Sequence, residues 1–129
     1  MKYLLDVNAL VALAFFHHEF HDRVVDWVRA NRPTIVTTAI TELGFVRVLA
    51  QVPSYGICIA EARTLLVRLK KNEVYPFTFL ADDHDISHLP RWVKSPKQTT
   101  VGHLVELARA NEVVLATLDE KIPGAYLIA

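Results

Sequence analysis

Residues 3–10 read Tyr3-Leu4-Leu5-Asp6-Val7-Asn8-Ala9-Leu10 and combine two structural signals. The apolar run predicts a buried strand that ends at Asp6. Asn8 is a suitable N-cap for a helix that would follow the strand. The next apolar residues have helical spacing: Ala9, Leu10, Leu13 and Ala14. A strand that passes directly into a helix is the repeating unit of parallel α/β sheets, so this stretch indicates an α/β fold.

The alternation of strands and helices continues along the chain. Runs rich in β-branched residues predict further strands at 34–37, 74–79, 113–117 and 125–128. Amphipathic stretches predict helices at about 19–30, from Thr38 as N-cap to about Ala50, at 57–70, and from a cap at Thr99 or Thr100 onwards. Residues 81–96, with mixed charge and two prolines, are the least regular part. This order predicts a single domain, residues 1–129, with a mostly parallel central sheet and helices on both faces.

The composition of the chain limits its partners. Apolar residues make up 52% of the sequence, which is high for a small protein and predicts that some apolar surface meets another chain. The chain has 14 basic and 14 acidic side chains, so it lacks the broad positive field of proteins that coat nucleic acid. A nuclease that reaches phosphates through a bound cation remains compatible with this balance.

The sequence carries no signal for membrane insertion or export. Its longest apolar stretches fall well short of the roughly 20 residues that span a bilayer, so no membrane partner is expected. A signal peptide is not indicated, because Asp6 interrupts the N-terminal apolar run. We therefore expect a cytoplasmic protein. The single cysteine, Cys58, has apolar neighbours in a helical pattern and is expected to be a small buried residue.

Acidic residues recur where the predicted strands end. Asp6 ends the first strand, Glu42 lies early in the helix after the second, and Asp119 follows the strand at 113–117. Ligands of open parallel sheets bind beyond the carboxyl ends of the strands, and oxygen-only ligands select Mg²⁺ or Mn²⁺. Such a cation can activate water and polarise a phosphodiester, so metal-assisted hydrolysis is the expected chemistry. Acids at these positions are also common helix caps, which is the competing structural interpretation.

Other polar clusters favour structural roles. The histidines His17, His18 and His21 lack the further ligands that a zinc site needs, so helix-start packing or a surface role is the favoured interpretation. The acidic group 82–85 with His88 is interpreted as a solvated turn and helix cap. Arg47 is interpreted as a phosphate contact at the edge of the acidic pocket, with a surface ion pair as the alternative. The basic residues near Trp92 could guide single-stranded RNA, but a solvated loop is favoured.

Three motifs of the chain, in the right order, resemble those of PIN-domain VapC toxins. The motifs are Leu4-Leu5-Asp6-Val7-Asn8-Ala9-Leu10, Thr41-Glu42-Leu43-Gly44-Phe45-Val46-Arg47 and Leu115-Ala116-Thr117-Leu118-Asp119. A fourth pattern, His18-x-x-His21 followed by Trp27, is frequent in one VapC subgroup. The resemblance covers nearly the whole chain, and it is the combination of motifs that is specific.

The resemblance implies a PIN-like three-layer fold and a Mg²⁺-dependent endoribonuclease, with Mn²⁺ as a possible substitute. Asp6, Glu42 and Asp119 would be the catalytic and metal-binding residues. Asn8, Arg47 and Thr100 are the candidate substrate-binding residues. The family further implies a homodimer, an RNA substrate and a cognate VapB-like antitoxin whose tail occupies the active-site groove.

The chain departs from the family pattern at one acidic position. The family has Thr-Asp at the start of the penultimate helix, and alignment of residues 104–108 with that helix places Thr100 on the threonine and Val101 on the aspartate. Valine cannot bind a metal, so full activity and a two-metal arrangement are in doubt. The alternative hypothesis is therefore a degenerate PIN module that binds antitoxin or RNA without efficient cleavage.

Overall fold

The computed structural model describes all 129 residues. In chain order its elements are β1 (Lys2–Leu5), α1 (Val7–Ala14), α2 (His21–Asn31), β2 (Thr34–Thr37), α3 (Ala39–Gln51), α4 (Ile59–Lys71), β3 (Phe77–Phe79), α5 (Thr99–Ala110), β4 (Val114–Thr117) and β5 (Tyr126–Leu127). Short 3₁₀ turns occur at Pro53–Tyr55, Ile86–His88 and Pro96–Gln98. None of the helices has both the length and the apolar character needed to cross a bilayer.

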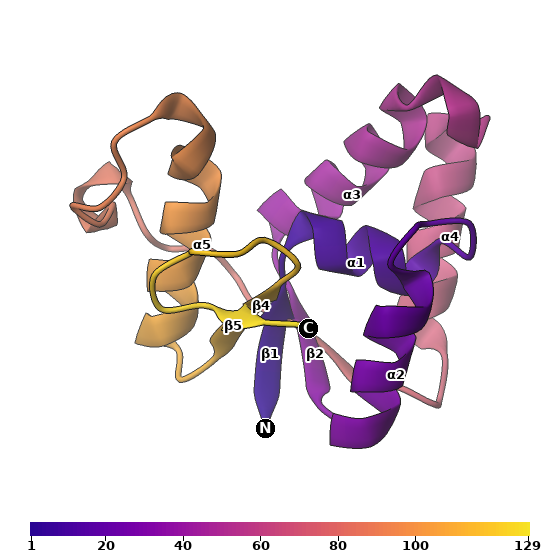
Figure 1. Cartoon of the computed structure of the whole chain (residues 1–129), viewed down its shortest axis with the longest axis horizontal. Helices are drawn as coiled ribbons and strands as arrows, with labels where there is room; N and C mark the ends of the chain where they lie inside the picture. Colours follow the sequence, from indigo (N-terminus) through magenta and orange to yellow (C-terminus); the bar gives the residue numbers. More distant parts are fainter.

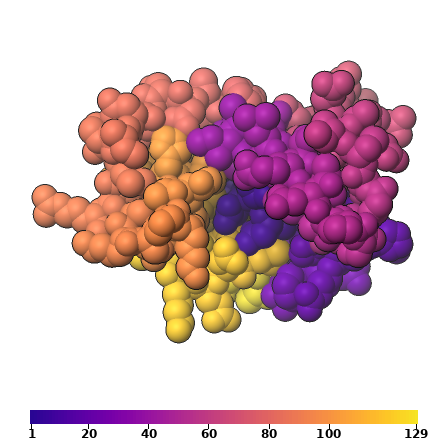
Figure 2. Space-filling model, turned by 90° about the horizontal axis from the view of Figure 1, so that it is seen from above, coloured from indigo at the N-terminus to yellow at the C-terminus, as the bar shows by residue number.

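The five strands form one parallel sheet in the order β3-β2-β1-β4-β5. The central strand β1 pairs with β2, where Leu4 lies opposite Val36, and with β4, where Leu5 lies opposite Ala116. Helices α1 to α4 lie on one side of the sheet and α5 on the other (Figure 1). The predicted three-layer α/β fold is confirmed. Figure 2 looks onto the edge where the strands end, and the indigo N-terminal residues lie there in a hollow between purple, orange and yellow segments.

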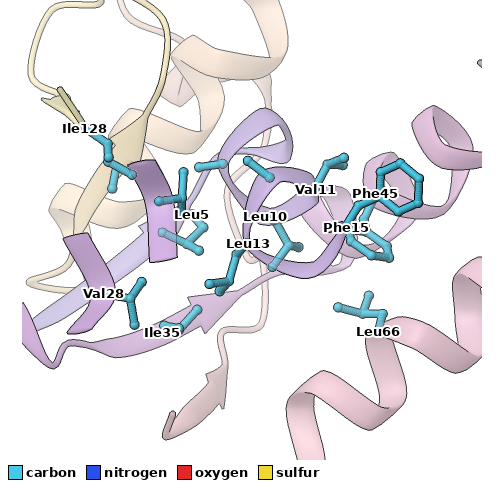
Figure 3. Close-up of a cluster of buried hydrophobic side chains, with 14 of the residues drawn as sticks. Leu5, Leu10, Val11, Leu13, Phe15, Val28, Ile35, Phe45, Leu66 and Ile128 are labelled. Atoms are coloured by element: carbon cyan, nitrogen blue, oxygen red, sulfur yellow. The ribbon is translucent and has the colours of Figure 1, made fainter. Parts of the chain in front are cut away.

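Two apolar clusters hold the helices to the sheet. Successive residues of a strand point to opposite faces, so Leu5 and Ile35 join the larger cluster while Leu4 and Val36 join the smaller one. Figure 3 shows side chains of the larger cluster, where residues of β1 and β2 meet residues of α1 to α4. The smaller cluster packs α5 against β1, β2 and β4. The two clusters therefore hold the sheet between the two layers of helices.

The helix starts differ from two sequence predictions. Asp6 caps α1, because its carboxylate accepts a hydrogen bond from the backbone N–H of Val7 at 2.9 Å. The prediction that Asn8 is the cap is wrong, and Asn8 lies inside the first turn of α1. Helix α5 begins at Thr99 and has no side-chain cap, so the predicted cap at Thr99 or Thr100 is wrong as well. Thr38 caps α3 as predicted, by accepting the N–H of Thr41.

Two further details differ from the sequence predictions. Strand β3 is shorter than predicted, because the Asn72 side chain accepts the N–H groups of Val74 and Tyr75 and removes them from the sheet. Cys58 is exposed rather than buried, since its sulfur caps α4 by accepting the N–H of Glu61 at 3.4 Å.

Candidate active site

The carboxyl ends of β2, β1 and β4 bring the predicted acids to one edge of the sheet. Asp6 directly follows β1, Glu42 lies early in α3 after β2, and Asp119 follows β4 by two residues. These three strands are parallel neighbours, so their carboxyl ends lie side by side. The acids of three separate sequence segments therefore enter the same part of the molecule.

Asp6 is the most enclosed of these acids. Its side chain is 8% exposed, and both of its oxygens accept hydrogen bonds. The N–H of Val7 donates to one oxygen at 2.9 Å, and the hydroxyl of Thr117 donates to the other at 2.9 Å. The bond from Thr117 ties the end of β4 to the end of β1, so the Asp6 carboxylate has a fixed orientation.

Burial raises the pKa of the Asp6 carboxyl above its usual value of 3.8. The hydrogen bonds from Thr117 and Val7 oppose this shift, while the negative charge of Asp119 adds to it. The effect of Asp119 means that the two carboxylates lie close enough to repel each other. A buried acid beside a second acid is the electrostatic situation that a bound cation relieves.

Asn8 and Thr117 connect the start of α1 to the loop after β4. The side-chain oxygen of Asn8 accepts the N–H of Leu118 at 3.3 Å. The hydroxyl oxygen of Thr117 accepts the N–H of Asp119 at 3.1 Å while its hydrogen is donated to Asp6. Asn8 thus orients the loop that carries Asp119. The substrate contact expected for Asn8 stays a prediction.

Glu42 is held by two donors from other elements. The hydroxyl of Thr37, the last residue of β2, donates to Glu42 Oε2 at 2.6 Å. The ammonium of Lys70, in the last turn of α4, contacts the same oxygen at 2.6 Å. The Glu42 carboxylate is therefore neutralised by a lysine of its own chain.

The two groups of acids are separate in this arrangement. No three His, Cys, Asp or Glu side chains lie together closely enough to hold one metal ion. Asp6 and Asp119 form one group, and Glu42 with Lys70 forms the other. The available donors around Asp6 are all oxygen atoms, which is the set that Mg²⁺ and Mn²⁺ prefer. Mg²⁺ needs only one or two carboxylates because it keeps several waters, so the Asp6 and Asp119 pair fits such an ion.

The remaining candidates are one residue of α3 and two residues of α5. Arg47 is exposed on α3 and forms no ion pair or side-chain hydrogen bond, so the alternative of a surface ion pair is not observed. Thr100 is exposed in the first turn of α5. Val101 is in the same turn, where it is half-buried and packs against the smaller apolar cluster.

Three residues that orient the acids were not predicted from the sequence: Thr37, Lys70 and Thr117. Each of the two threonines is the last residue of a strand, is fully buried, and donates its hydroxyl to a carboxylate. A polar β-branched residue that ends an apolar strand beside an acidic motif was the available signal. Lys70 gave no such signal, because 28 residues separate it from Glu42.

The histidine and aspartate clusters have the structural roles that were favoured. The ring of His21 hydrogen-bonds the carbonyl of Ala12 at 2.7 Å, and that of His18 accepts the N–H of Phe20, so both order the start of α2. Asp85 caps the 3₁₀ turn at Ile86–His88. Asp82 also pairs with His103 of α5, a long-range contact that the sequence did not indicate.

Comparison with known proteins assigns the family. The family profile of the PIN domain matches residues 3–125. "Ribonuclease VapC38" of Mycobacterium tuberculosis H37Rv is 44% identical over 132 residues, which cover 98% of this chain and 89% of the relative. "Ribonuclease VapC44" of the same species is 36% identical over 136 residues and covers 97% of this chain and 94% of the relative.

A solved structure has the same fold. The crystal structure of Mycobacterium tuberculosis VapC20, described as a sarcin-ricin loop cleaving toxin, superposes with a TM-score of 0.64. The match covers 92% of this chain and 89% of that protein. The two sequences are 10% identical, so the likeness concerns the fold alone.

Proposed function

Because this chain belongs to the VapC family of PIN-domain proteins, we propose that it is a toxin endoribonuclease of a VapBC-type toxin–antitoxin system. The proposed reaction is Mg²⁺-dependent hydrolysis of RNA phosphodiester bonds. The observation that carries the proposal is the buried Asp6 carboxylate, which is fixed by Thr117 and lies beside the charge of Asp119. These are the acids of the first and last family motifs.

The proposed metal ligands are Asp6, Asp119 and Glu42. Asp6 and Asp119 fit a divalent cation as they stand, while Glu42 would first have to leave Lys70. The bound ion would activate water and neutralise charge on the phosphate. Thr117 and Asn8 would hold the carboxylates in place, as residues behind a metal's ligands do.

The substrate is proposed to approach from the exposed side of this edge. Arg47 has a free guanidinium that suits bidentate contact with a phosphate, and Thr100 offers a hydroxyl from the first turn of α5. Since the chain has no net charge, such local contacts must provide most of the grip on RNA.

Two protein partners belong to the proposal. The family supports a VapB-like antitoxin, and the apolar surface supports a homodimer. Four large apolar side chains are between 62% and 74% exposed: Phe16, Leu43, Ile59 and Val74. A cytoplasmic location is part of the same proposal, because RNA and the antitoxin would be met there.

The second candidate function is a PIN module that binds RNA or antitoxin but cleaves poorly. Val101 favours it, since an apolar side chain occupies the aligned position of a family acid. The ion pair between Glu42 and Lys70 also favours the degenerate module, because Lys70 neutralises a carboxylate that would otherwise bind the metal. Metal binding and cleavage separate the two candidates when both are measured.

The test is RNA cleavage by the purified protein with Mg²⁺ or with EDTA, beside Mg²⁺ calorimetry. We expect cleavage only with Mg²⁺, and its loss in Asp6→Asn and Asp119→Asn. Asp83→Asn is the matched control, because Asp83 is an exposed acid outside the site. Equal cleavage in EDTA, or full cleavage by both site variants, would contradict the proposal. Metal binding without cleavage would support the degenerate module.

A further inference from the structure

Lys70 is the one basic side chain that forms an ion pair with an acid of the candidate site. Its Nζ lies 2.6 Å from Glu42 Oε2, which also accepts the Thr37 hydroxyl at 2.6 Å. The side chains of Lys70 and Glu42 are 29% and 24% exposed, so the pair is shielded from water more than a surface pair but is not sealed. Such a pair can both form and open.

Lys70 forms an ion pair with no acid other than Glu42 in this structure. Two ion pairs join a lysine or arginine to an acid, and Lys70 takes part only in the one with Glu42. Its Nζ also lies 5.6 Å from the centroid of the Phe79 ring, and Phe79 is 52% exposed. A released ammonium would therefore be a free cation beside Glu42 and the exposed Phe79 ring.

A divalent ion at this edge changes the charge around Glu42. In the metal-free protein the ammonium neutralises this carboxylate, while Asp6 and Asp119 repel each other. A bound cation attracts the Glu42 carboxylate and repels the ammonium, so both effects weaken the ion pair. A negatively charged RNA phosphate nearby would then attract the released Lys70 ammonium.

We infer that Lys70 is a substrate-binding residue that exchanges Glu42 for an RNA phosphate when the divalent cation binds. This inference rests on the proposed function. It assigns to Lys70 two successive partners of the same charge, first the glutamate and then the phosphate. The lysine would thus compete with the metal ion in the free protein and assist RNA binding in the loaded one.

The first experiment measures Mg²⁺ affinity by calorimetry for the wild type, Lys70→Met and Lys71→Met. Methionine preserves the length of the aliphatic stem and removes the charge. Lys71 is the matched control, because it is the adjacent residue of α4, is exposed and forms no ion pair. We expect Lys70→Met to bind Mg²⁺ roughly tenfold more tightly, as expected when a group behind a metal ligand changes, and Lys71→Met to match the wild type.

The second experiment measures binding of a short fluorescein-labelled single-stranded RNA by anisotropy. Titrations are run over a range of salt with Mg²⁺ or EDTA, for times at which a gel shows intact RNA. With Mg²⁺, Lys70→Met should lower the slope of log affinity against log salt by about 0.7, which corresponds to one phosphate contact. In EDTA the slope should match that of the wild type, because Lys70 is then held by Glu42.

The outcomes separate this inference from the proposed function. Equal Mg²⁺ affinity of the wild type and Lys70→Met overturns the exchange and leaves the nuclease proposal standing. Metal binding by Lys70→Met but not by the wild type supports the competition and contradicts Mg²⁺-dependent activity of the natural chain. If neither binds Mg²⁺, both are overturned. An equal loss of slope in Mg²⁺ and EDTA would show a lysine that contacts RNA without any exchange.

Discussion

Asp6 combines three tasks at one residue, which makes its charge state decisive. It caps α1, receives the hydroxyl of Thr117, and lies beside Asp119. Asn is as good an N-cap as Asp, so the capping task survives removal of the charge. Asp6→Asn also removes the unfavourable free energy of a buried negative charge next to Asp119. The substitution therefore separates the structural role of Asp6 from its proposed role as a metal ligand.

We predict that Asp6→Asn stabilises the metal-free protein at neutral pH and abolishes stabilisation by Mg²⁺. Burial, with a further contribution from Asp119, raises the pKa of Asp6 in the folded state above its value of 3.8 in the unfolded chain. The folded state therefore binds this proton more tightly, and the resulting stability is lost as pH rises through the folded pKa. Urea unfolding between acidic and neutral pH measures the free energies of unfolding of Asp6→Asn and the wild type. Their difference should shrink towards zero below the unfolded-state pKa of Asp6.

A second prediction concerns the apolar side chain at the aligned acid position. Val101→Asp should tighten Mg²⁺ binding by roughly 10 to 100-fold, the range seen even for groups one shell further from a metal. It should also lower metal-free stability, because Val101 packs against the smaller apolar cluster and a further carboxylate adds repulsion. Calorimetry and unfolding in EDTA measure the two effects.

Thr100→Asp is the control for the Mg²⁺ affinity alone, because Thr100 is itself a proposed substrate contact. It adds the same charge to the same turn of α5 at an exposed residue, so any favourable effect of the helix N-terminus is shared. An unchanged Mg²⁺ affinity and unchanged RNA cleavage in Val101→Asp would mean that position 101 does not face the metal.

The positions of the acids at the ends of strands could be predicted from sequence, but their partners and their division into two groups could not. Asp6, Glu42 and Asp119 each stand where a predicted strand ends, and parallel strands place such ends together. The pairing of Glu42 with Lys70 depends on how α4 packs against α3, which no local pattern encodes. The prediction of Asn8 as the N-cap was wrong because Asp6 both ends β1 and caps α1, so the helix begins at Val7.

At the scale of elements, close packing of α1 against α3 fixes the acids relative to each other. Gly44 of α3 is buried against Val7, the first residue of α1. A Cβ added at Gly44 would lie 2.6 Å from a methyl of Val7, which is closer than side-chain carbons approach. Gly44 is thus the reason that the helix with Glu42 can lie so near the residue that follows Asp6.

We predict that Gly44→Ala destabilises the protein by up to about 2 kcal/mol although alanine favours helices. The overpacking against Val7 costs about 1 to 3 kcal/mol, and the helix propensity offsets up to about 1 kcal/mol of it. Urea unfolding measures the net effect. In a Val7→Ala background the same substitution should be neutral or stabilising, because the opposing methyls are gone. A loss of equal size in both backgrounds would rule out this contact as the cause.

The elements themselves could be largely predicted, and the misses have local causes. All five strands and all five main helices lie within a few residues of the predicted ranges. Strand β3 begins later than predicted, because the N–H groups of Val74 and Tyr75 donate to the Asn72 side chain instead of a neighbouring strand. Helix α5 starts without a cap because the preceding turn at Pro96–Gln98 leads directly into it.

At the scale of the whole molecule, the chain exposes more surface than a monomer of its size. Its accessible surface is 7831 Å², whereas a folded monomer of 14.6 kDa has about 6,900 Å². The excess of about 900 Å² is close to the roughly 800 Å² that each partner buries in a standard interface. The strongly exposed apolar residues Phe16, Leu43, Ile59 and Val74 fit a chain that covers part of this surface on association.

We predict a homodimer held mainly by apolar contact. Light scattering at micromolar concentration should give a mass near twice 14.6 kDa. Because the chain has no net charge and apolar burial does not depend on ion pairing, the dissociation constant should not rise between low and high salt. Association should also show a negative heat-capacity change, the marker of buried apolar surface. A monomer at these concentrations would contradict the dimer, and a dimer that dissociates in high salt would instead be held by its charges.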